Sequence, residues 1–102
     1  MKKIIDGKTY NTETATHIGN RSHSYPGDFS YCDEDLYLTK KGTFFLAGAG
    51  GAMSKYSQSC GQNTQCGGSG MEVLSNPEAL SWCERYDIDS DIIEQYFEIE
   101  EG

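Results

Sequence analysis

Apolar and polar residues alternate in two stretches that each surround a turn, and this pattern predicts two β-hairpins. In residues 4–10, strand-forming side chains flank Asp6 and Gly7. Asp-Gly is a preferred pair for a two-residue type I′ turn, because both positions need a positive φ angle. In residues 36–46, alternating leucines are followed by two phenylalanines, and Gly42 can take the left-handed position of the connecting loop. The consecutive phenylalanines suggest a strand covered on both faces, or on one face and by a partner.

The strongest helix signal lies near the C-terminus, in residues 75–86. Ser75 and Glu78 have the spacing of a capping box, and Pro77 lies in the first turn, where its missing N–H costs nothing. Apolar residues recur at the period of a helix face. These residues are Ala79, Trp82, Cys83 and Tyr86. The pattern predicts that Cys83 is a small core side chain.

Two weaker patterns predict two further helices. The first covers residues 12–18 after the first hairpin, with Asn11 as its cap. The second covers residues 89–97, with Asp89 or Ser90 as its cap. The apolar face of this second helix consists of Ile92, Ile93, Tyr96 and Phe97.

The order of these elements predicts an α+β fold. We expect an antiparallel sheet of four or five strands, made of the two hairpins and a short strand at 71–75, packed against the two C-terminal helices. Residues 19–30 are expected to be loop. Residues 48–70 contain seven glycines and no apolar periodicity, which predicts a long Gly-rich loop. The chain is expected to form one domain, 1–102, whose acidic end at 98–102 frays.

Charge is distributed unevenly along a chain whose formal net charge is −8. Residues 1–56 hold seven Lys or Arg and six Asp or Glu, whereas residues 57–102 hold one and ten. The acidic part would repel nucleic acid, and no compact basic patch offsets it, so we expect no direct nucleic-acid binding. Two interpretations of the acidity stay open: a solvated helical face that aids solubility, or a surface for a basic partner protein.

The sequence contains neither a secretory signal pattern nor an apolar stretch long enough to span a membrane, so we expect a cytoplasmic protein without membrane contact. A disulfide between Cys60 and Cys66 would close a short loop, but a reducing compartment argues against it. The cysteines also lack the CxxC spacing of a zinc site, so we expect no metal and no cofactor. A zinc site assembled from cysteines with His17 or His23 is the alternative.

The Gly-rich sequence GAGGAM, at 48–53, raises the question of phosphate binding. Phosphate loops use glycine backbone N–H groups ahead of a helix. Met53 replaces the third glycine of GxGxxG, however, and no well-patterned helix follows. The match is therefore weak, and we expect instead that Gly48, Gly50 and Gly51 relax a strand end into a bend. The residues that this segment would present to a ligand or partner are Gly48, Gly50, Gly51, Ser54, Lys55 and Tyr56.

The sequence also contains two acidic clusters. In CDED at 32–35, strand geometry lets only Asp33 and Asp35 converge, and we expect them to protect an exposed edge from strand pairing. The second cluster, at 87–98, matches an EF-hand loop except that Ile92 replaces its glycine. Helix capping explains these aspartates better.

Three segments carry a resemblance: KKIIDGKTYNTETA (2–15), LYLTKKGTFFLAGAGGAMSKY (36–56) and SNPEALSWCERY (75–86). In this order they resemble a group of small uncharacterised single-domain proteins of gram-positive gut bacteria, their phages and mobile elements. The similarity covers nearly the whole chain, and its specificity lies in the YNTETA segment together with the LY-hairpin-GG unit. The resemblance implies a cytosolic protein with a mobile-element context and no assigned reaction. Such proteins often carry an acidic residue where this chain has Ala49.

These observations favour a non-enzymatic protein-interaction module with an acidic C-terminal face. The acidic residues expected to meet an unknown protein partner are Glu94, Glu98, Glu100 and Glu101. The alternative is a small phosphate-bearing or nucleotide-like ligand bound by residues 48–55. No spacing places His17 or His23 beside a nucleophile, so no catalytic residue is predicted. We expect a monomer or a weak dimer.

Overall fold

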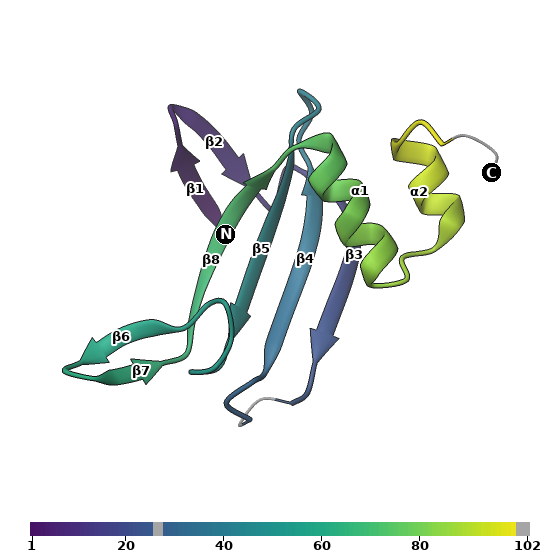
Figure 1. Ribbon diagram of the computed structural model, residues 1–102. Helices are drawn as coiled ribbons and strands as arrows, with labels where there is room; N and C mark the ends of the chain where they lie inside the picture. The colour runs from purple at the N-terminus through teal and green to yellow at the C-terminus, as the bar shows by residue number, and fades with distance from the viewer. Residues whose placement is uncertain (26–27, 100–102) are drawn as a thin grey trace.

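The computed structural model describes residues 1–25 and 28–99, and these residues form an α+β fold with a four-stranded antiparallel sheet and two helices (Figure 1). This confirms the predicted fold class. The strands are β1 (Lys2–Ile5), β2 (Lys8–Asn11), β3 (Thr16–His23), β4 (Cys32–Leu38), β5 (Phe44–Gly50), β6 (Gln58–Gly61), β7 (Thr64–Cys66) and β8 (Gly68–Leu74). The helices are α1 (Asn76–Arg85) and α2 (Ser90–Tyr96).

Both predicted hairpins are present, but only one belongs to the main sheet. The main sheet has the order β3-β4-β5-β8, whereas β1 and β2 form a separate two-stranded sheet. The predicted turns are confirmed, because Asp6, Gly7 and Gly42 have φ angles of 51°, 75° and 90°. Turn chemistry therefore identified the hairpins, although it could not show which hairpin joins the sheet.

The helix predicted at 12–18 is wrong, and so is most of the loop predicted at 19–30. Residues 12–15 form a turn, and β3 then runs from Thr16 to His23 beside β4. A seven-residue helix rich in threonine is marginal in water, because few hydrogen bonds offset its nucleation. Pairing with β4 instead places Ile18 in the core, with 3% of its surface exposed.

The two faces of the main sheet are covered by different elements. Figure 1 shows α1 and α2 on one side of the sheet and the β1–β2 hairpin on the other. Phe44 faces the helices and stacks on Phe97, whereas Phe45 faces the hairpin and contacts Tyr10 edge to face. Both phenylalanines are almost fully buried, so the prediction of a strand covered on both faces is confirmed.

The core lies between the sheet and α1. The predicted capping box at Ser75 and Glu78 begins this helix, and Trp82 and Cys83 are buried as expected. Ile92, Ile93 and Phe97 of the α2 region pack partly buried against the same cluster. The buried members of the core are Ile18, Leu36, Phe44, Leu46, Leu74, Ala79, Trp82 and Cys83.

The long loop predicted at 48–70 is largely ordered structure. β5 continues to Gly50, β8 already begins at Gly68, and the β6–β7 hairpin projects between them (Figure 1). A disulfide joins Cys60 to Cys66 across this hairpin, which corrects the expectation of unpaired thiols. Antiparallel pairing holds their Cα atoms 5.8 Å apart, within the range that a disulfide needs.

The C-terminal end of the chain is described only in part. Most of the expected frayed tail at 98–102 lies outside the described residues, which end at Ile99. Within the part of the chain that the structure describes, no helix is long and apolar enough to cross a membrane.

Candidate functional site

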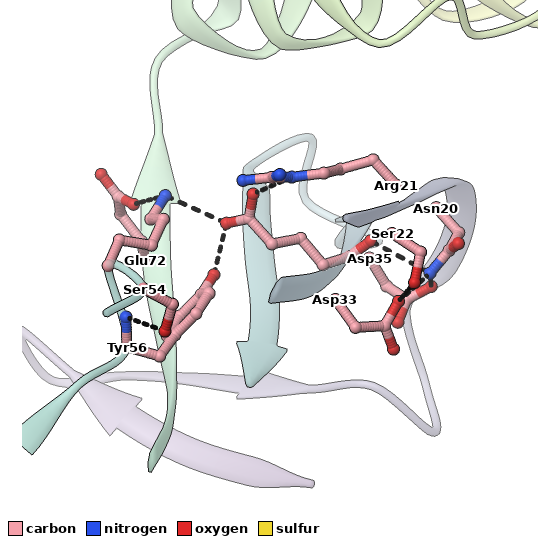
Figure 2. Close-up of polar contacts among 10 residues, drawn as sticks. Asn20, Arg21, Ser22, Asp33, Asp35, Ser54, Tyr56 and Glu72 are labelled. Carbon is pink, nitrogen blue, oxygen red and sulfur yellow. Dashed lines mark hydrogen bonds and ion pairs between the residues drawn. The ribbon is translucent and has the colours of Figure 1, made fainter. Parts of the chain in front are cut away.

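A buried carboxylate, Glu34, forms the centre of the polar interior. Its side chain on β4 is 1% exposed and lies on the sheet face that the helices cover. It accepts bonds from Arg21 Nε at 2.8 Å, Lys55 Nζ at 3.0 Å and Tyr56 Oη at 2.5 Å (Figure 2). We call Arg21, Glu34, Lys55 and Tyr56 the Glu34 cluster. Such a buried charge is tolerated because two cations and a hydroxyl satisfy it.

The cluster connects elements that are distant in sequence. Lys55 also pairs with Glu72 of β8, with 3.2 Å between Nζ and Oε2. The Arg21 guanidinium from β3 lies over the ring of Tyr86, 4.5 Å from its centroid, at the end of α1. The cluster therefore fixes segment 51–57 against the sheet and links β3 to the helical layer.

The glycines of GAGG make room for this arrangement. A Cβ atom at Gly48 would lie under 3.0 Å from the ring of Tyr56, and one at Gly50 would lie equally close to Ser54. Neither glycine has a positive φ angle, and both are paired within β5. The expected bend at these two positions is therefore wrong, because they are flat strand positions over which segment 51–57 passes closely.

Of the residues predicted to bind a ligand or partner, most are brought together here, and their polar groups bond within the chain. Ser54 Oγ donates to the Gly51 carbonyl at 2.7 Å and accepts from the backbone N–H of Tyr56 at 3.2 Å. Gly51 itself lies against the backbone carbonyl of Phe29, where a Cβ atom would not fit. The polar groups of Lys55 and Tyr56 contact Glu34.

Sequence reasoning missed Glu34 and Arg21 as partners of this segment. A usable signal was the alternation within CDED, because Glu34 must face the opposite side of the strand from Asp33 and Asp35. Leu36 is two residues further along β4, so Glu34 shares its buried face. The identity of the cations that would meet Glu34 there depends on strand pairing that no local pattern encodes.

The contacts within the Glu34 cluster shift the pKa values of Glu34, Lys55 and Tyr56 away from neutrality. Burial acts to raise the pKa of Glu34, but hydrogen bonds from Tyr56, Lys55 and Arg21 outweigh it and lower that pKa. Burial and the Glu34 carboxylate together raise the pKa of Tyr56 far above its ordinary value. Burial acts to lower the pKa of Lys55, yet its carboxylate partners raise it. A general acid or base needs a pKa near the working pH, and these shifts all lead away from neutrality.

A second polar group lies on the opposite face of the sheet (Figure 2). Asp33 and Asp35 converge as predicted, since Asn20 Nδ2 donates to both carboxylates at 2.8 and 3.1 Å. His17 Nε2 lies 2.8 Å from Asp35 Oδ1. The expected edge-protecting role is wrong, because β4 is flanked by β3 and β5. Among the described residues, no group of His, Cys, Asp and Glu has the arrangement of a metal site.

The C-terminal helices present a separate acidic surface. Because the apolar side of α2 packs toward the core, its carboxylates project outward. Asp89 caps α2 by accepting a hydrogen bond from the Asp91 N–H at 2.9 Å, which confirms the capping role predicted for Asp89. Glu100 and Glu101 lie outside the described residues. We call the exposed carboxylates of residues 84–99 the acidic helical face, which consists of Glu84, Asp87, Asp89, Asp91, Glu94 and Glu98.

In comparisons with known proteins, no family model, no curated protein and no solved structure matches this chain. Two features of its own structure therefore bear on function. They are the Glu34 cluster, which is closed within the chain, and the acidic helical face, which is open to solvent.

Proposed function

We propose that this protein is a non-enzymatic binding module that contacts a basic partner protein through the acidic helical face. One observation carries the proposal: among the described residues, the negative charges of the acidic helical face have no cationic side chain paired with them. Within residues 1–25 and 28–99, no carboxylate of this face forms an ion pair. The sequence from residue 57 onward offers Arg85 as its single cation. An uncompensated charge of one sign attracts a partner of the opposite sign and speeds its association.

The Glu34 cluster supports a binding role over a catalytic one. Its proton-bearing groups are satisfied by one another and have pKa values displaced from neutrality. Proton transfer at physiological pH would have to work against these shifts. The resemblance to mobile-element proteins suggests a host protein as the partner, by analogy with small acidic proteins that cover nucleic-acid-binding surfaces. In this proposal the protein acts in the cytoplasm, a reducing compartment in which the Cys60–Cys66 disulfide would be reduced.

The alternative of a small ligand at residues 48–55 stays a prediction. Gly48 and Gly50 are occupied by the close approach of Tyr56 and Ser54, and their backbone lies inside the sheet. No observation in this segment favours a ligand over the packing role of these glycines.

The proposal is tested with a charge-neutralised pair of residues on α2 and just beyond it. Glu94 and Glu98 are exposed and serve no cap, so the Glu94→Gln/Glu98→Gln variant removes two charges and leaves the fold intact. The matched control is Asp6→Asn/Glu13→Gln, which removes two exposed carboxylates at the other end of the chain. Asn-Gly favours the type I′ turn as Asp-Gly does, so this control also folds.

The readout is affinity for a synthetic peptide of alternating Lys and Ala, measured by fluorescence anisotropy at low and physiological salt, together with capture of host proteins from a lysate. We expect the α2 variant to lose about tenfold in peptide affinity, or roughly 1.4 kcal/mol, and to lose its captured proteins. The control should keep both. Equal binding by the wild type and the α2 variant would exclude the acidic helical face as the contact surface.

A further inference from the structure

A pocket lined by lysines lies at the end of the molecule opposite the β6–β7 hairpin. It has a volume of about 580 Å³ and is bounded by the β1–β2 hairpin and the β4–β5 loop, which lie at the same end of the sheet (Figure 1). This volume falls within the roughly 300–1,000 Å³ typical of small-molecule sites. The pocket shares no residue with the Glu34 cluster or the acidic helical face.

The side chains around this pocket are cationic and hydroxylic. Three lysines, Lys8, Lys40 and Lys41, line the pocket, and no aspartate or glutamate does. In the part of the chain that the structure describes, none of these lysines forms an ion pair. Four threonines and one asparagine also line the pocket. They are Thr9, Thr14, Thr39, Thr43 and Asn11.

The walls of the pocket are held in place by the fold. Tyr10 is 4% exposed and contacts Phe45 with 5.4 Å between ring centroids, which fixes β2 against the main sheet. In the facing loop, the Thr43 N–H donates to Thr39 Oγ1 at 3.0 Å, and the Thr39 N–H donates to the Thr43 carbonyl at 2.9 Å. The pocket is thus present before any ligand arrives, and a ligand need not order these walls on binding.

We propose that this pocket binds a small, multiply charged phosphate compound. In a chain of net charge −8, three uncompensated ammonium groups around one concavity attract an anion, which would relieve their mutual repulsion. Lysine ammonium and threonine hydroxyl groups both donate hydrogen bonds to phosphate oxygens, and charge-assisted bonds of this kind are the stronger ones. Tyr10 is buried against Phe45, so the pocket offers no free aromatic face for a base. The recognised part is therefore the phosphate group.

The test uses inorganic pyrophosphate as the probe and NMR titration of backbone amides as the measurement, with sodium chloride at equal ionic strength as the reference titration. Shifts are expected at residues 7–11 and 39–43 with pyrophosphate and not with chloride. The variant Lys40→Gln/Lys41→Gln removes two charges from an exposed loop and should weaken pyrophosphate binding at least tenfold. Its matched control, Lys2→Gln/Lys3→Gln, removes two exposed charges from β1 that do not line the pocket, and should change affinity less than threefold.

Two outcomes would overturn the proposal. One is the absence of pyrophosphate-specific shifts at these residues up to millimolar concentration. The other is an equal loss of affinity in both double variants, which would show general attraction to lysines and no defined site. Because the pocket and the acidic helical face share no residue, failure here leaves the proposed partner binding untouched, and the α2 variant should bind pyrophosphate like the wild type.

Discussion

Glu34 determines how the Gly-rich segment is held, because one carboxylate meets Arg21, Lys55 and Tyr56. Breaking a buried ion pair by removing one partner typically costs about 3–5 kcal/mol, since the remaining charge is left uncompensated. Lys55 is 43% exposed, so water can solvate its ammonium group when the Glu34 carboxylate is removed. We therefore expect the loss of this carboxylate to lower the free energy of unfolding by about 3 kcal/mol, near the lower end of that range. The small residue that permits this cluster is Gly48, directly opposite Glu34 in the β4–β5 register.

Gly48→Ala should destabilise the protein because its methyl group would meet the Tyr56 ring. We expect a loss of about 1–3 kcal/mol in the free energy of unfolding, the usual cost of overpacking. Gly70 pairs with Gly48 on the neighbouring strand, and a Cβ there would lie 3.8 Å from Tyr56, an ordinary contact. Gly70→Ala is therefore the control and should be neutral or slightly stabilising. Equal effects in urea unfolding would contradict the packing role of Gly48.

We expect the stabilising contribution of Glu34 to decrease as the pH falls. Its hydrogen bonds lower its pKa in the folded state below the ordinary 4.5, so its contribution is complete above that value and disappears as pH falls through the folded pKa. Of the groups that face Glu34, Arg21, Lys55 and Tyr56 keep their protons throughout this range because their pKa values are raised.

We expect urea unfolding at pH 7 to separate the wild type from Glu34→Gln by about 3 kcal/mol, and the gap to shrink at pH 3. Glu72, which pairs with Lys55, is present in both proteins, so its direct contribution largely cancels in the difference. A gap of the same size at both pH values would contradict the lowered pKa of Glu34 in the folded state.

At the scale of elements, local turn and capping chemistry predicted the structure where a few neighbouring residues decide it. The type I′ turn at Asp6-Gly7 and the capping box at Ser75 are examples, and both are confirmed. Segment 12–23 was mispredicted because its strand exists through pairing with β4, a contact between residues far apart in sequence. The β6–β7 hairpin was missed for a related reason: its polar strands have no apolar periodicity, and a disulfide joins them.

Reducing the disulfide should loosen the β6–β7 hairpin alone. An isolated two-stranded hairpin is marginally stable, and closing a loop of this length contributes about 2 kcal/mol. We therefore expect reduction to speed amide hydrogen exchange at residues 58–66 by about thirtyfold. No residue of this hairpin belongs to the core cluster, so exchange in β5 and α1 should not change. The Cys60→Ser/Cys66→Ser variant should exchange like the reduced wild type. Unchanged exchange at residues 58–66 on reduction would show that the disulfide does not stabilise this hairpin.

At the scale of the whole molecule, the fold places opposite charges at separate surfaces. The helical layer carries the acidic face, and the N-terminal hairpin helps to form the lysine-lined pocket. The exposure of Glu94 and Glu98 could be predicted from sequence, because helical periodicity indicates which side of α2 faces the core. The pocket could not be predicted, because it arises where Lys8 and the 39–43 loop meet in space. The Glu34–Tyr56 contact was missed for the same reason, since 22 positions separate the two residues.

The central claim is that Glu34 holds segment 51–57 against the sheet, so that this segment is not a mobile loop. Amide hydrogen exchange of Gly51 and Met53 tests it most directly, because their N–H groups donate to the carbonyls of Tyr31 and Phe29 at 2.8 and 2.7 Å. We predict that both amides are protected in the wild type and exchange about a hundredfold faster in Glu34→Gln, while the amide of Leu46 stays protected. Unprotected Gly51 and Met53 amides in the wild type, or equal rates in both proteins, would contradict the account.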